Sequence, residues 1–170
     1  QIIRPFFMLC KIDKFLRKLY LISGYFAALF LILVATFIII GIASRIFGFY
    51  IRGLAEYSGY SMAAASFLAL AYTFGEKGHI RITLFLEKAK NKFRKILEIW
   101  CFVAASFFSG LLSYYFIKML IISIKFRERS EGADEIYIWI PQLSVAIGST
   151  IFFICILHNL ILLLIKRGKF

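Results

Sequence analysis

The sequence predicts an all-α integral membrane protein with four transmembrane helices, arranged as two hairpins. Of its 170 residues, 62% are hydrophobic, which is more than a soluble domain of this size carries. Four apolar segments are each long enough to cross a hydrocarbon core of about 30 Å as a helix. Lysines and arginines gather beside these segments, where they act as topology signals in membrane proteins.

The chain begins with an amphipathic pattern over residues 6–19, in which apolar and basic residues occupy opposite faces of a helix. We expect this helix to lie along the membrane surface. Residues 19–43 follow without any charge and form the first predicted span. No small-residue cleavage site ends this apolar segment, so we expect it to be retained and not removed as a signal peptide.

The second predicted span covers residues 54–75, after a short loop at residues 44–53. Its only charge is Glu56, within about one turn of the end that adjoins this loop. The two spans therefore form a helical hairpin.

A basic connection follows, and its residues 83–96 are predicted to form a second amphipathic helix. We expect it to lie flat where phospholipid headgroups meet water, with Phe85, Phe93 and Trp100 as interfacial anchors. The alternative is a solvated helix of a globular domain. The long apolar segments on both sides favour the membrane interpretation.

The second hairpin consists of a third span at residues 97–124 and a fourth at residues 141–165. A loop of mixed charge separates them. Pro141 is expected in the first turn of the fourth span, where its missing N–H group costs no hydrogen bond.

The distribution of basic residues predicts the orientation. Fifteen of the 21 lysines and arginines lie in the two termini and the central connection, and six lie in or beside the other two loops. Both termini are therefore expected in the cytoplasm, and the protein in the bacterial inner membrane. The net charge of +12 is assigned to this asymmetry and to contacts with phospholipids, so no nucleic-acid partner is expected.

The sequence shows no phosphate-binding loop, metal-ligand cluster or nucleophile elbow, so neither an enzyme nor a bound cofactor is expected. Glu56 could carry a proton or a cation. Its shallow position favours a structural ion pair with Arg52 or Arg45. His158 could relay protons, but a neutral ring bonded to a neighbour such as Asn159 is the simpler interpretation.

Small residues four positions apart recur in three of the predicted spans, and such pairs let helix backbones approach closely. They could pack within the bundle or against a larger partner. The spans contain no paired carboxylates and no cluster of Asn or Gln, which a transporter built from this chain alone would be expected to show. The sequence thus suggests the companion of a transporter. The pairs are Gly59 with Ala63, Ser106 with Gly110, and Ala146 with Thr150.

Five short features occur in an order that resembles the small membrane subunit of tripartite ATP-independent periplasmic (TRAP) transporters. They are Arg45 after the first span, Glu56 at the start of the second, the segment Gly78-His79-Ile80-Arg81, the segment Trp139-Ile140-Pro141-Gln142 and Gly148. The family usually shows an acidic residue soon after the Gly-His segment, where this chain has Thr83.

The resemblance implies a non-catalytic scaffold that binds a large membrane subunit. That large subunit would carry the substrate and sodium sites, and a periplasmic substrate-binding protein would deliver an organic acid to it. External charges of this chain would help to seat the periplasmic protein. The candidates are Arg52, Arg127, Arg129, Glu131, Asp134 and Glu135.

Two other interpretations stay open. The chain could be a self-sufficient, four-span exporter that exchanges protons on Glu56, although its acid is shallow and its central connection is long. It could also be a membrane assembly factor without a transport partner.

Overall fold

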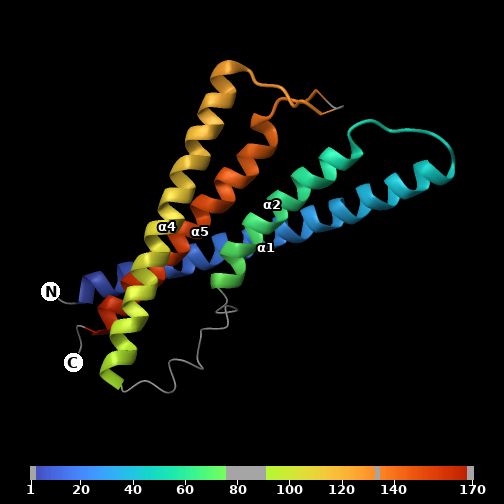
Figure 1. The fold of residues 1–170 in the computed structure, drawn as a ribbon. Helices are drawn as coiled ribbons and strands as arrows, with labels where there is room; N and C mark the ends of the chain where they lie inside the picture. The colour runs from blue at the N-terminus through green and yellow to red at the C-terminus, as the bar shows by residue number, and fades with distance from the viewer. Residues whose placement is uncertain (1–2, 76–90, 133–134, 168–170) are drawn as a thin grey trace.

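The computed structural model describes residues 3–75, 91–132 and 135–167, and this part of the chain is helical apart from its loops and one isolated β-bridge. Two antiparallel hairpins are visible in Figure 1, and their connecting loops lie towards the same end of the molecule, which we call the loop end. The described helices are α1 (Ile3–Ile46), α2 (Leu54–Gly75), α4 (Asn91–Phe126) and α5 (Trp139–Arg167).

The helices pack in the order α1, α2, α5, α4, so α2 and α5 occupy the middle of the bundle. Aromatic rings of α2 reach two neighbouring helices. Phe67 meets Phe116 of α4 edge to face, with the ring centroids 5.2 Å apart. Phe74 meets Phe102 of α4 and Phe152 of α5 in the same manner. These contacts connect the two hairpins through α2.

Within the described ranges, three helical segments are long and apolar enough to cross a membrane: Lys14–Ile46, Ile99–Phe126 and Trp139–Leu164. Helix α2 is not among them. Its 22 residues would extend about 33 Å, but its alanines, serines and tyrosines make it less apolar. Because α1 and α5 cover α2, its side chains need not be apolar to lie at membrane depth. That α2, the second predicted span, also crosses the membrane stays a prediction.

The N-terminal part of the fold differs from the predicted arrangement. The predicted amphipathic helix at 6–19 and the predicted span at 19–43 are parts of the single helix α1, without a break at Leu19. No glycine or proline occurs between Phe6 and Ser23, so nothing in the local sequence ends the helix there.

The central connection also differs from its prediction. Residues 91–96, the last part of the predicted surface helix, begin α4 and continue directly into the span. The first glycine of α4 is Gly110, so this stretch has no local helix breaker. Residues 83–90, with the predicted anchor Phe85, lie outside the described part of the chain.

Candidate functional site

Charge is confined to the surface of the described bundle. Every charged side chain whose burial is described is exposed, except Glu56, which is half-buried. The buried polar side chains in the same part of the chain are all serines. Two further buried side chains, Tyr20 and Cys155, contribute a phenol hydroxyl and a thiol. The buried serines are Ser23, Ser44, Ser61, Ser109, Ser113, Ser123 and Ser149.

Two of these serines join helices. The Ser23 hydroxyl of α1 donates to the Leu68 carbonyl oxygen of α2 at 2.7 Å. The hydroxyls of Ser113 on α4 and Thr150 on α5 are hydrogen-bonded at 3.0 Å. Thr150 also donates to the Ala146 carbonyl oxygen at 2.7 Å, so Ser113 donates in the bond between the two hydroxyls. Each hairpin is thus held by a hydrogen bond between its two helices.

The predicted pairs on α4 and α5 lie between these two helices. Ala146 is buried, and a Cβ atom added at Gly110 would lie 3.1 Å from the Phe153 ring. Ser106 and Gly110 also line an open groove of about 420 Å³, whose other walls are apolar. The groove is lined by Val103, Ser106, Phe107, Gly110, Leu111, Phe153 and Leu160.

Of the predicted small-residue pair on α2, Gly59 faces outwards and Ala63 does so only partly. A Cβ atom at Gly59 would meet nothing within 4 Å, and Gly59 is exposed. Ala63 is half-buried. Gly59 therefore packs against no other described helix of this chain, and its side of α2 is open to a partner or to lipid.

Three close approaches, at Gly148, Gly24 and Gly75, were not among the predicted pairs, because spacing does not show which small residue meets a neighbouring helix. A Cβ atom at Gly148 would lie 2.9 Å from the Phe67 carbonyl carbon and 3.1 Å from the Leu68 nitrogen, so α5 and α2 almost touch there. Gly148 was noted only for the family resemblance. At Gly24 a Cβ atom would lie 2.7 Å from Tyr72 Cγ.

The contact of Gly24 with Tyr72 has a counterpart nearby. A Cβ atom at Gly75 would lie 2.8 Å from Tyr20 Cδ2. Each helix of the first hairpin thus presents a tyrosine to a glycine of the other. These two contacts set the distance between α1 and α2 at this end of the hairpin.

Glu56 is the third residue of α2. A carboxylate in the first turn of a helix interacts favourably with the positive end of the helix dipole. Arg45 and Arg52 are both exposed, in the last turn of α1 and in the loop before α2. An interaction with the helix dipole at this position requires no proton transfer.

Hydrogen bonds hold the described residues of the loop between α4 and α5. Arg129 and Tyr137 form an antiparallel bridge, and the Arg129 guanidinium lies 5.1 Å from the Tyr137 ring centroid. The Ser130 nitrogen donates to the Ile136 oxygen at 2.7 Å. The Ser130 hydroxyl is hydrogen-bonded to the Tyr60 hydroxyl of α2 at 2.9 Å. The loop of one hairpin is thereby fastened to the other.

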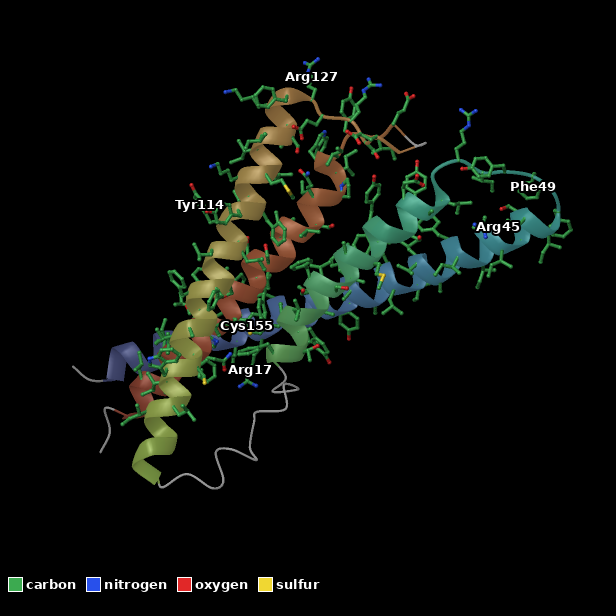
Figure 2. The ribbon with its side chains drawn as sticks, in the orientation of Figure 1. Arg17, Arg45, Phe49, Tyr114, Arg127 and Cys155 are labelled. Atoms are coloured by element: carbon green, nitrogen blue, oxygen red, sulfur yellow. The ribbon has the colours of Figure 1, made fainter. Side chains whose placement is uncertain are left out.

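The charged candidates for contact with a periplasmic protein gather in the two loops, and Arg127 projects away from the bundle in Figure 2. Asp134 lies outside the described residues, as do Gly78, His79 and Arg81. Trp139 and Pro141 are the first and third residues of α5. Trp100 is exposed on α4, whereas the side chain of Phe93 is not described. The exposed candidates are Arg52, Arg127, Arg129, Glu131 and Glu135.

The described residues contain no group of three or more His, Cys, Asp or Glu side chains that could hold a metal ion. Cys101 and Cys155 are free thiols.

The family model of the DctQ component of tripartite ATP-independent periplasmic transporters matches residues 34–166. The match extends from the middle of α1 almost to the end of α5. No curated protein matches the chain.

Proposed function

Because this chain belongs to the DctQ family of tripartite ATP-independent periplasmic transporters, whose members are transporter components and not enzymes, we propose that it is a non-catalytic scaffold. It braces the large membrane subunit of a sodium-coupled transporter for an organic acid, and sodium and substrate bind only that subunit. It resides in the bacterial inner membrane with both termini in the cytoplasm, so the loop end faces the periplasm.

One observation carries the scaffold proposal: no described charged side chain is buried, Glu56 alone being half-buried, while the buried serines Ser23 and Ser113 join helices. A transport pathway needs ionisable or polar groups that exchange partners at membrane depth. Hydroxyls bonded across tightly packed helices instead hold a fixed arrangement. A fixed bundle beside a moving subunit is what a scaffold provides.

The outward side of α2 is the proposed contact with the large subunit. Gly59, Met62 and Ser66 are exposed along it and succeed one another at helical spacing. A helix surface that faces lipid can carry side chains of any size. A surface on which a second helix packs closely needs small residues, because they let the two backbones approach. Ala63 lies beside this surface and is half-buried.

The two loops are the proposed contact with the periplasmic substrate-binding protein. Arg52, Glu131 and Glu135 are exposed there. Charges at the rim of such a contact raise the association rate more than the affinity, and salt weakens their effect. Arg129 is engaged with Tyr137 and has a structural role in the same loop.

The test is co-purification with the large subunit in mild detergent. The wild-type chain should retain that subunit, and Gly59→Leu should lower the retained amount about tenfold, a loss of about 1.4 kcal/mol of binding. Gly41→Leu on α1 is the control, because Gly41 also has nothing within 4 Å. No large subunit bound to the wild-type chain would refute the scaffold. Equal retention by Gly59→Leu would refute only the choice of surface.

A further inference from the structure

The loop end contains a pocket that the transporter role does not explain. It measures about 310 Å³ and lies where α4 ends and α5 begins. Its walls combine an aliphatic side chain, two aromatic rings and one basic residue. They are Ile124, Tyr137, Trp139 and Arg127.

Arg127 adopts a backbone conformation that favours glycine, with φ at +50°. The Arg127 nitrogen donates to the Ile124 oxygen, and the Glu128 nitrogen donates to the Ser123 oxygen, at 3.3 and 3.1 Å. This is the Schellman pattern that ends many helices with a left-handed residue. Arginine in this position costs about 1 kcal/mol relative to glycine.

The end of α1 shows the same pattern with the expected residue. Gly48 has φ at +75°, its nitrogen donates to the Arg45 oxygen, and the Phe49 nitrogen donates to the Ser44 oxygen. Two helices of one molecule thus end identically, one on glycine and one on arginine. A strained residue beside a pocket points to a use for its side chain.

We propose that this pocket binds the headgroup of an anionic phospholipid, with the Arg127 guanidinium on the phosphate. Guanidinium groups pair with phosphate oxygens through two parallel hydrogen bonds. Trp and Tyr are enriched at the level of lipid headgroups, where one side of the ring is apolar and the other is wet. Tyr137 and Trp139 provide these rings.

The surface of α4 below the pocket suits the acyl chain of the same molecule. Ile117, Ile121 and Ile124 are exposed and share one face of the helix. An acyl chain laid along them would place the headgroup at Arg127, one turn beyond Ile124. A periplasmic protein would contact the water-exposed charges of the loop but not the aliphatic side chains of Ile117, Ile121 and Ile124, which lie at membrane depth. A lipid can contact both these side chains and Arg127, so it is the favoured occupant.

The other charges near the pocket leave Arg127 available. The Ser123 hydroxyl donates to Glu128 Oε2 at 2.7 Å, so this carboxylate is engaged on the neighbouring residue. Arg129 lies over the Tyr137 ring. Lys125, in the last turn of α4, adds a second positive charge, while Glu131 and Glu135 are exposed carboxylates of the loop.

The variant Arg127→Gly separates binding from folding, because glycine is the favoured residue at this helix end. We expect native mass spectrometry of the detergent-solubilised protein to show retained phosphatidylglycerol on the wild type. Arg127→Gly removes both hydrogen bonds of the guanidinium and should reduce that occupancy at least tenfold, or by about 1.4 kcal/mol of binding. Its unfolding temperature without added lipid should stay equal or rise. Arg52→Gly, which removes an exposed arginine of the other loop, should retain the lipid.

Unchanged phosphatidylglycerol occupancy in Arg127→Gly would overturn the proposal. An equal loss in Arg52→Gly would also overturn it, because general surface charge would then explain retention. Inorganic phosphate should not raise the unfolding temperature of the wild type. If it raises that temperature in the wild type and not in Arg127→Gly, the site binds a free anion and the lipid proposal is wrong. Weaker association of Arg127→Gly with the periplasmic protein, at unchanged lipid occupancy, would assign Arg127 to that protein instead.

Discussion

Helices α1 and α2 form one hairpin, yet their side chains meet opposite surroundings. Helix α1 contains the most apolar of the three candidate spans, and most of its large apolar side chains are exposed, Ile38, Ile39 and Ile42 among them. Helix α2 is not apolar enough to be counted as a span, yet it buries Ala64, Ala65, Leu68 and Ala71. In a soluble protein the apolar helix would be the buried one.

The difference shows what solvates each helix. Lipid is as apolar as leucine, so apolar side chains gain nothing by leaving it for another helix. Close contact between helix backbones and hydrogen bonds in the interior stabilise association instead. Long aliphatic side chains on α1 thus indicate contact with lipid, and alanine, serine and glycine on α2 and its neighbours indicate contact with protein.

The largest effect should come from filling the contact between α2 and α5. Gly148→Leu places side-chain atoms against the backbone at Phe67 and Leu68, which cannot move aside as a side chain can. We expect the free energy of unfolding to fall by about 3 kcal/mol, the upper end for overpacking. Thermal unfolding of the detergent-solubilised chain would measure it.

Gly41→Leu is the matched control on α1, since nothing lies within 4 Å of a Cβ atom there. It should leave stability unchanged or raise it by about 0.5 to 1 kcal/mol, because leucine favours a helix more than glycine does. Equal losses in both variants would contradict the assignment of α1 to lipid and of α2 to protein.

A smaller effect is expected between α1 and α2. Gly24→Ala brings a methyl group against Tyr72 near the base of its ring, and we expect a loss of about 1 to 2 kcal/mol. Removing the ring with Tyr72→Ala in the same molecule should make the added methyl group harmless. A double-mutant cycle on unfolding free energies measures this coupling. Additive losses would show that the ring and the glycine do not set the distance between these helices.

The smallest effect concerns the hydrogen bond from Ser23 to the Leu68 oxygen. Ser23→Ala should cost about 0.6 kcal/mol, the average for such bonds between membrane helices. Thr36→Ala is the control, because the exposed Thr36 bonds only within α1, to the Ile32 oxygen. If the unfolding temperature falls no further for Ser23→Ala than for Thr36→Ala, the bond from Ser23 to the Leu68 oxygen does not stabilise the contact between α1 and α2.

The sequence predicts some features of this fold well and others poorly. The predicted start of the second span, residue 54, coincides with the first residue of α2, because Gly53, with φ at +81°, and the turn before it precede the helix. Pro141 lies in the first turn of α5, as its missing N–H group requires. Local chemistry determines both features, so the sequence contains them.

Features that depend on neighbouring helices could not be predicted. The amphipathic pattern of residues 6–19 shows which sides of a helix are apolar, but not whether the helix bends before the span. Similarly, Gly59 and Gly24 each have a small residue four positions on, yet no other described helix approaches Gly59, whereas Tyr72 of α2 lies against Gly24. Which glycine meets a neighbour depends on how the helices cross, and only the structure shows that crossing.

The central claim is that this subunit supports transport without performing it, and solute uptake into reconstituted vesicles tests that claim most directly. Vesicles with this chain alone should take up no organic acid under a sodium or proton gradient. Vesicles that also contain the large subunit, with the periplasmic protein added, should accumulate it, and Glu56→Gln in this chain should leave that uptake intact. Proton-coupled transport by this chain alone, abolished by Glu56→Gln, would contradict the account.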